Sequence, residues 1–246
     1  MAKQEIEIRT EDGVAKASLF LPVKPPAGAQ PGVILYMDAF GLRPALDDMG
    51  ARLAGAGYVV LIPDLFYRFG DYGPLDAKTA FSDPETRDTI MRMMKETTSD
   101  KNRRDSGSFI EAITRAGATG KIGVVGYCMG GGRALTAAAA YPDRIAAAAS
   151  FHGGNLASDT PDSPHRLVSS IKGRVYIGSA GVDRSFPPEQ SARLAEALRA
   201  AEVDHIVENY VGMAHGWAVS DHGVYDEQGA ERHWTRLTTL FAECLS

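Results

Sequence analysis

A cysteine flanked by glycines is the residue of this chain best suited to chemistry. Cys128 stands at the centre of the hexapeptide Gly126-Tyr127-Cys128-Met129-Gly130-Gly131. A nucleophile with a glycine two positions away on either side is typical of a nucleophile elbow, a sharp turn between a strand and a helix. Glycines avoid collisions at such a turn, and the N-terminus of the helix stabilises a thiolate. The alternative is a core cysteine in a glycine-rich packing turn, which explains the flanking strand and helix less well.

A cysteine nucleophile needs a base and an acid that orients the base, in the chain order nucleophile, acid, base for this kind of elbow. Asp183 follows the expected strand Val175–Ile177, and His215 follows the expected strand that starts at His205. An aspartate after a strand is more often a turn or helix cap, and a histidine beside glycines is more often an ordinary loop residue. Their joint order and their placement after strands favour a catalytic triad with Cys128.

The loop after the first buried strand supplies the next candidates. Asp38 and Ala39 lie in the segment Tyr36-Met37-Asp38-Ala39-Phe40-Gly41. Such a loop commonly donates one backbone N–H to an oxyanion hole, and the residue after the nucleophile donates the other. Ala39 and Met129 are therefore the expected oxyanion donors. Asp38 can also be a turn or helix-capping aspartate.

Five residues close to these motifs are candidates for the wall of a substrate pocket, namely Asp38, Phe40, Tyr127, His152 and Trp217. We expect His152, which ends the strand after the elbow helix, to have mainly a structural role. The other histidines show no ligand spacing for zinc, and the sequence contains no HExxH pattern, P-loop or dinucleotide-binding fingerprint. The sequence therefore predicts no metal site and no cofactor site.

Short apolar runs separated by helical stretches must hold these residues in place. The expected strands are Glu5–Ile8, Val14–Leu21, Val33–Met37, Tyr58–Ile62, Ile122–Val125, Ile145–Ser150, Val175–Ile177 and His205–Val207. Runs of this kind indicate a buried, mostly parallel sheet. The expected helices are Pro44–Ala54, Met129–Ala140, Pro188–Ala200 and a final helix with Ala230, His233, Trp234, Leu237, Leu240, Phe241 and Cys244 on one face.

The segment from Phe66 to Thr98 is the least regular part of the sequence. It holds several aromatic residues, followed by a charged helix that ends in three methionines. A long excursion after the carboxyl end of a strand usually lies over the ligand crevice. Surface decoration explains this segment equally well.

Composition narrows the classes of function. The chain has 246 residues, of which 44% are hydrophobic and 23% charged, and its net charge is −5. These values are typical of a globular chain and argue against nucleic-acid or anionic-membrane partners, which need a clustered basic surface. The segment Met1–Thr10 lacks the apolar core of a secretory signal, and no apolar run is long enough for a membrane span. With only two cysteines, a disulfide framework is not expected, and a reducing cytoplasm fits.

Taken together, these motifs resemble those of the dienelactone hydrolase family. The hexapeptide 126–131 resembles its cysteine elbow, Met37–Gly41 its acidic loop, and Pro63–Arg68 a further characteristic segment. Asp183 and His215 match its acid and base positions. The resemblance covers about residues 30 to 243. It implies one α/β-hydrolase domain over residues 1–246, with a mostly parallel central sheet, helices on both faces and no large cap domain.

The resemblance also implies an activity and its partners. It implies hydrolysis of a small ester or lactone through a thioester on Cys128, without a cofactor or metal. A thioesterase or an acyltransferase with the same triad is the alternative. A ligand-binding relative without catalysis is a third possibility, although no member of the triad is missing. The expected partner is a small-molecule ester or lactone, and the expected state is a monomer or a small homo-oligomer.

Two positions depart from the family pattern. The family usually has glutamate at the first acidic position, where this chain has Asp38, and the shorter side chain is expected to fall short of the nucleophile. A clamp arginine for a substrate carboxylate usually follows the catalytic histidine by four positions, where this chain has Val219. Arg68, Arg87 and Arg92 compete for the position of a second clamp residue. We therefore expect no strong preference for carboxylated substrates.

Overall fold

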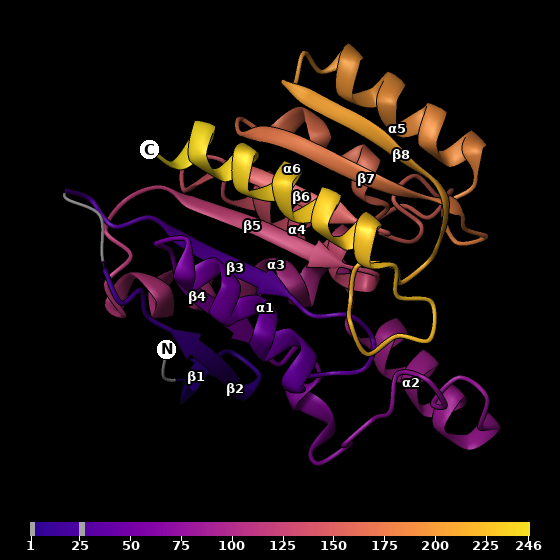
Figure 1. Cartoon of the computed structure of the whole chain (residues 1–246), viewed down its shortest axis with the longest axis horizontal. Helices are drawn as coiled ribbons and strands as arrows, with labels where there is room; N and C mark the ends of the chain where they lie inside the picture. Colours follow the sequence, from indigo (N-terminus) through magenta and orange to yellow (C-terminus); the bar gives the residue numbers. More distant parts are fainter. Residues whose placement is uncertain (1–2, 25–27) are drawn as a thin grey trace.

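Eight strands form one sheet in the computed structural model, which describes residues 3–24 and 28–246 and leaves residues 1–2 and 25–27 outside the description. The spatial order of the strands is β1-β2-β4-β3-β5-β6-β7-β8 (Figure 1). Their bounds are β1 Lys3–Thr10, β2 Gly13–Phe20, β3 Gly32–Tyr36, β4 Val59–Pro63, β5 Ile122–Tyr127, β6 Ile145–Phe151, β7 Arg174–Val182 and β8 His205–Ala214. All eight strands expected from the sequence are confirmed, with ends that shift by a few residues.

Parallel pairing dominates the sheet. β1 and β2 form an antiparallel hairpin, and β2 pairs antiparallel with β4. Every other pair is parallel, including β3 with β5, in which Tyr36 lies opposite Gly126. The carboxyl ends of β3, β5, β6, β7 and β8 therefore meet at the same edge. Parallel α/β sheets place their ligand sites at this edge.

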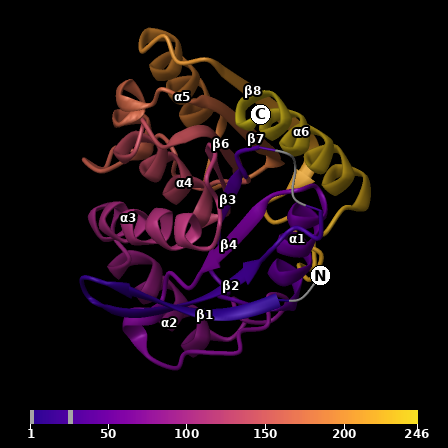
Figure 2. The same ribbon diagram turned by 90° about the vertical axis from the view of Figure 1, so that its left-hand side faces the viewer.

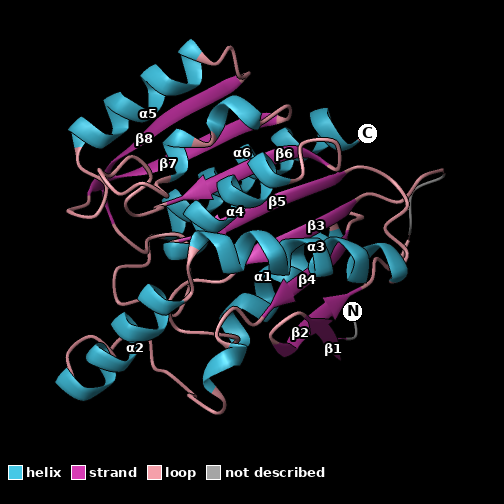
Figure 3. Cartoon of the chain, turned by 180° about the vertical axis from the view of Figure 1, so that it is seen from behind, coloured by secondary structure: helices cyan, strands magenta, loops and turns pink. Residues whose placement is uncertain are grey.

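Helices cover both faces of the sheet. α1 (Pro44–Gly55) and α6 (Glu227–Leu245) lie on one face, and α3 (Ser99–Arg115), α4 (Met129–Ala140) and α5 (Pro188–Ala200) lie on the other (Figures 2 and 3). The apolar stripe expected on α6 is buried from Ala230 to Phe241, and Cys244 is half-buried. The buried strands and these helices form one hydrophobic core. In the described part of the chain no helix is long and apolar enough to cross a bilayer.

Helix α3 is not anticipated by the sequence pattern, because the buried face of its first half is polar. Asn102 and Asp105 are buried, and the side-chain amide of Asn102 donates to the carbonyl of Arg133 at 3.0 Å. The hydroxyl of Ser106, also buried, lies 2.7 Å from the hydroxyl of Tyr36. Hydrogen bonds therefore replace apolar contacts on this face, so the helical period of apolar residues is weak.

The irregular segment after β4 crosses the carboxyl edge of the sheet. It contains the short turn η1 (Tyr67–Phe69) and the helix α2 (Pro84–Glu96), which begins after Asp83, whose carboxylate accepts from the N–H of Thr86 at 2.8 Å. Figure 1 shows α2 beyond the ends of the central strands. Two further short 3₁₀ helices, η2 (Pro164–Arg166) and η3 (Val168–Ser170), lie in the connection from β6 to β7.

Candidate active site

A strained turn joins β5 to α4 and carries Cys128 at its tip. The φ and ψ angles of Cys128 are 55° and −122°, a conformation that residues other than glycine rarely adopt. A Cβ on Gly126 would overlap the carbonyl oxygen of Gly130, and a Cβ on Gly130 would overlap that of Tyr36. Glycine is therefore needed at positions 126 and 130 for steric reasons, as expected for a nucleophile elbow. Cys128 itself is partly exposed and lines a cavity.

We expect Gly126→Ala to destabilise the fold by about 3 kcal/mol, because the new methyl group would displace backbone atoms of the elbow. Gly132→Ala is the matched control. A Cβ on Gly132 would lie 3.4 Å from its nearest neighbour, an ordinary contact, and alanine is the better helix former. Thermal unfolding of the two variants measures the difference. Equal melting temperatures for the two variants would contradict the steric account of the elbow.

An aspartate–histidine pair lies beside the elbow. Nδ1 of His215, after β8, is 2.7 Å from Oδ2 of Asp183, after β7. The other carboxylate oxygen of Asp183 accepts from the N–H and hydroxyl of Ser185, at 2.8 and 2.6 Å. Ser185 thereby fixes the carboxylate so that one oxygen faces the histidine. Ser185 is not among the residues expected at the site, although aspartate side chains commonly bond to the backbone two residues further along the chain.

The charges in this pair follow from its surroundings. Burial by itself would lower the pKa of His215, but the charge of Cys128 and the hydrogen bond with Asp183 outweigh it and raise that pKa to about 10. Burial would raise the pKa of Asp183, but its bonds to His215 and Ser185 outweigh burial and lower that pKa. The two groups are therefore held as an imidazolium and a carboxylate near neutral pH.

The structure brings Cys128, Asp183 and His215 to the wall of one cavity of about 1060 Å³. A cavity of this size takes a small organic ligand. Apolar side chains from four parts of the chain also line it, namely Phe40, Phe81, Met91, Met94, Met129 and Val224. The segment between β4 and α3 thus forms part of the cavity wall. This position agrees with the expectation that a long excursion after a strand lies over the ligand crevice.

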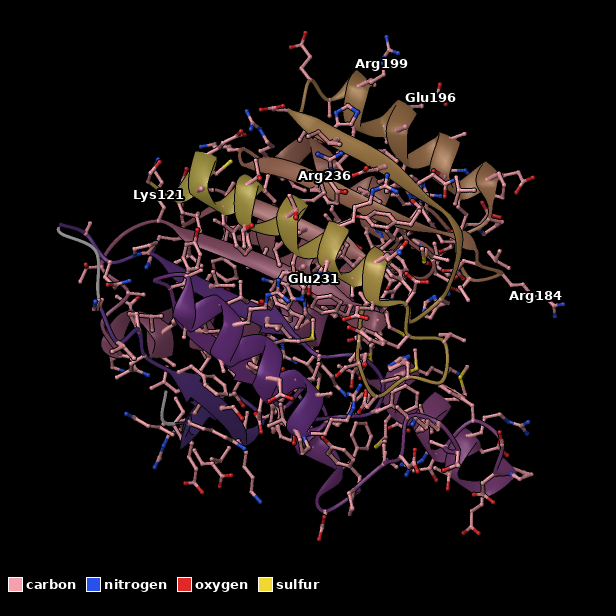
Figure 4. The ribbon with its side chains drawn as sticks, in the orientation of Figure 1. Lys121, Arg184, Glu196, Arg199, Glu231 and Arg236 are labelled. Carbon is pink, nitrogen blue, oxygen red and sulfur yellow. The ribbon has the colours of Figure 1, made fainter. Side chains whose placement is uncertain are left out.

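Four cationic residues reach this cavity as well, namely Lys78, Lys95, Arg133 and Arg184. Arg184 is exposed and extends outward from the carboxyl end of β7 (Figure 4). Arg133 donates to the carbonyl of Thr97, at the end of α2. Val219, where the resemblance predicts a clamp arginine, is fully buried and does not line the cavity. Arg68, Arg87 and Arg92 do not line it either.

Two backbone N–H groups near Cys128 lack protein partners. Within the described chain, neither Ala39 nor Met129 donates its N–H to another protein group. Ala39 is fully buried, and a buried N–H without a partner is rare. The contact of Gly130 with the carbonyls of Tyr36 and Met37 brings the elbow against the loop that holds Ala39. Met129 lines the cavity, whereas Ala39 is not among the lining residues, so the role of the Ala39 N–H as an oxyanion donor stays a prediction.

Of the five residues considered for the pocket wall, only Phe40 lines the cavity. Asp38, Tyr127, His152 and Trp217 are fully buried behind it. The hydroxyl of Tyr127 bonds to His233 at 2.8 Å, and Trp217 packs on Tyr210, so these two rings belong to the core. The sequence does not reveal that these residues belong to the core, because a position near a glycine motif does not show which side of a loop faces the core.

His152 supports the elbow from behind. Its Nδ1 accepts from the N–H of Cys128 at 3.1 Å, and its ring packs edge-on against His215, with 5.1 Å between ring centres. Burial, aided by the charges of neighbouring histidines, lowers the pKa of His152 well below its usual value. A neutral His152 can therefore accept this bond, as its expected structural role requires. In residues 3–24 and 28–246 no group of three or more potential ligands could hold a metal ion.

Comparisons with known proteins identify the family of this chain. The family model described as "Dienelactone hydrolase family" matches residues 16–245. A provisionally named carboxymethylenebutenolidase of Methylorubrum extorquens is 27% identical over 245 residues, covering 97% of this chain and 80% of the relative. The carboxymethylenebutenolidase of Rhodococcus opacus is 25% identical, covering 92% of this chain and 86% of the relative.

Solved structures show the same fold. The crystal structure of a provisionally named dienelactone hydrolase from Klebsiella pneumoniae is 23% identical and superimposes with a TM-score of 0.85, covering 98% of both chains. The strand order, the parallel core of the sheet and the helices on both faces are those of the α/β-hydrolase fold. Because the family model matches most of the length of this chain, this hydrolase belongs to the dienelactone hydrolase family.

Proposed function

We propose that this hydrolase cleaves small esters or lactones with Cys128 as nucleophile, His215 as base and acid, and Asp183 as the residue that orients His215. The observation that carries the proposal is the 2.7 Å bond between His215 and Asp183 on the wall of the cavity that also exposes Cys128. A nucleophile on a strained elbow next to an oriented base is the arrangement that covalent acyl transfer requires.

The first half of the reaction forms a thioester. The Cys128 thiolate, paired with the imidazolium of His215, attacks the carbonyl carbon of the ester. The oxygen of the tetrahedral intermediate accepts hydrogen bonds from the N–H groups of Ala39 and Met129. The carbonyl then re-forms, the ester C–O bond breaks, and the imidazolium gives its proton to the departing alkoxide. An alcohol leaves, or, for a lactone, the alcohol end of the opened ring stays attached.

The second half consumes water. Once Cys128 is acylated it carries no charge, so the main influence that raises the pKa of His215 disappears and the pKa falls. The neutral imidazole takes a proton from water while the hydroxide oxygen attacks the thioester carbonyl. Collapse of this second intermediate breaks the C–S bond, releases the carboxylic acid and restores the thiolate–imidazolium pair. Loss of the thiolate charge thus switches His215 from acid to base at the right step.

The substrate class rests on the cavity and on the names of the relatives. Relatives named carboxymethylenebutenolidase suggest a lactone, and the apolar lining suits an ester or lactone with an apolar group. Position 219 holds valine, which cannot donate hydrogen bonds to a substrate carboxylate, so this position favours no carboxylated substrate over a neutral one. A working thiol must stay reduced, so the proposal also places the protein in a reducing compartment such as the cytoplasm.

Trapping of the acyl-enzyme tests this proposal. We expect rapid quenching of the protein with p-nitrophenyl acetate, followed by peptide mass spectrometry, to show an acetyl group on Cys128. Treatment with iodoacetamide beforehand should abolish both the adduct and the turnover. Turnover without an adduct on Cys128 at any quench time would refute the mechanism. Addition of an alcohol separates the alternatives, because an acyltransferase makes a new ester whereas a hydrolase releases acetate.

A further inference from the structure

A buried ionic cluster next to the cavity takes no part in the mechanism above. Its centre is the guanidinium of Arg43, the residue that precedes α1. Nη1 and Nη2 of Arg43 bond to the two carboxylate oxygens of Asp38 at 2.6 and 2.8 Å. Nε and Nη2 bond to the two oxygens of Asp221 at 2.6 and 2.9 Å. His222 completes the cluster, with Nε2 at 3.1 Å from Oδ2 of Asp38.

The cluster joins two loops that carry the proposed machinery. Asp38 directly precedes Ala39, the expected oxyanion donor, and Oδ1 of Asp38 accepts from the N–H of Phe40 at 3.1 Å. Asp221 lies in the loop that follows His215, between β8 and α6. Arg43 therefore ties the turn around Ala39 to the loop of the catalytic histidine through bidentate bonds at both ends.

Burial makes this tie rigid. The side chain of Asp38 is fully buried and that of Arg43 is 7% exposed, whereas that of Asp221 is 36% exposed. Burial would raise the pKa of Asp38, but its bonds to His222 and Arg43 outweigh burial and lower that pKa. The carboxylate thus stays charged, and a buried charge holds its partners in place because leaving it unpaired is costly.

The bonds of Asp38 do not reach the thiol of Cys128. Within the described chain, the carboxylate of Asp38 bonds to the N–H of Phe40, to Arg43 and to His222, and none of these bonds goes to Cys128. This arrangement fits the expectation that aspartate falls short of the nucleophile at this position. The acidic side chain instead shapes the turn on which Ala39 lies.

We propose that Arg43 is a positioning residue for the oxyanion hole: by clamping Asp38 to Asp221, it holds the N–H of Ala39 where the oxyanion forms. This inference rests on the proposed function. An oxyanion donor works only within hydrogen-bond distance of the developing charge, and a displacement of about 1 Å in an active site can cost about 100-fold in rate. Arg43 acts through Ala39 and touches no reacting atom.

The test compares ester hydrolysis with thiol alkylation in Arg43→Met. We expect kcat for p-nitrophenyl acetate to fall by about 10- to 100-fold, with KM changed by less than about threefold. Alkylation of Cys128 by iodoacetamide forms no oxyanion, so its rate and its pH dependence should stay those of the unaltered protein. A general structural defect would lower both rates together, so the split between them identifies a positioning role.

Arg52→Met is the matched control. Arg52 belongs to α1 and forms two bonds to Glu231 of α6, but this ion pair is exposed and neither residue lines the cavity. We expect its kcat to stay unchanged.

Two further variants test the clamp if Arg43→Met does not fold. Asp221→Ala cuts one end of the clamp and keeps the buried pair, and the double variant Asp38→Asn/Arg43→Met removes both buried charges together.

The outcomes separate this inference from the proposed function. Values of kcat within about threefold of the unaltered protein in the folded clamp variants would overturn the role of Arg43. A parallel fall of alkylation and turnover would overturn it too, because the cluster would then act on the thiol. Should Arg43→Met fail to fold, the other two variants decide. Activity that survives in Cys128→Ala would instead refute the proposed function itself.

Discussion

Replacing Cys128 by alanine is expected to lower kcat for ester hydrolysis by about 10³-fold or more, with the fold intact. The size of the loss follows from covalent catalysis, in which removal of the nucleophile leaves only binding and oxyanion stabilisation. Cys128 occupies the elbow. The backbone conformation of this residue places its side chain at the cavity wall. Steady-state kinetics with p-nitrophenyl acetate, together with circular dichroism, measure the effect.

Cys244→Ala is the matched control for this prediction. Cys244 lies half-buried near the end of α6, away from the cavity, and burial raises the pKa of its thiol. It should therefore react slowly with iodoacetamide and contribute only packing energy. We expect the variant to keep full activity and to lose a little thermal stability. Activity within a few-fold of the unaltered protein in folded Cys128→Ala, or an inactive but folded Cys244→Ala, would contradict the assignment of the nucleophile.

Much of the fold could be predicted because its signals are local. The apolar runs of the central strands, the glycines around Cys128 and the apolar stripe of α6 each form a pattern that is complete within a short stretch of sequence. The carboxyl ends of parallel strands meet by topology alone, so the residues after β5, β7 and β8 could be expected near one another from the strand pattern. The pairing of Asp183 with His215 follows from this rule.

The parts that sequence reasoning missed depend on contacts between distant segments. Arg43 and Asp221 lie 178 positions apart, and nothing in either stretch of sequence points to the other. The buried polar face of α3 conceals its helical period for a similar reason, since the side chains of Ser106 and Asn102 bond to other segments. Long-range polar contacts leave no periodic trace in a single sequence.

The second large effect concerns His215 and Asp183. We expect His215→Ala to lower kcat nearly as much as Cys128→Ala, because the thiolate loses its partner and neither half-reaction has a proton carrier. The double variant Cys128→Ala/His215→Ala should be little worse than either single variant. Residues that act as one unit show such non-additivity, whereas independent residues lose activity by the product of their separate effects.

Asp183→Asn tests the orienting acid through pH. The raised pKa of His215, about 10, keeps its ring protonated from acid pH up to that value, and Asp183 contributes to the rise. Loss of the carboxylate should lower the pKa of His215, so less imidazolium remains at pH 7 to 8 to pair with the thiolate. We therefore expect slower alkylation of Cys128 by iodoacetamide in this pH range, with the rate recovering only at higher pH. The kcat for ester hydrolysis should fall with it.

Ser185→Ala distinguishes this electrostatic effect from a loss of geometry. It removes the hydroxyl that bonds to Asp183 and that also lies 3.3 Å from Nδ1 of His215, and it leaves the backbone N–H bond to Asp183 and the carboxylate charge in place. Because the carboxylate stays beside His215, the alkylation profile of Ser185→Ala should remain close to that of the unaltered protein, while that of Asp183→Asn moves. If both profiles move equally, orientation matters more than charge. If neither moves and the losses from Cys128→Ala and His215→Ala multiply in the double variant, the three residues do not work as one unit.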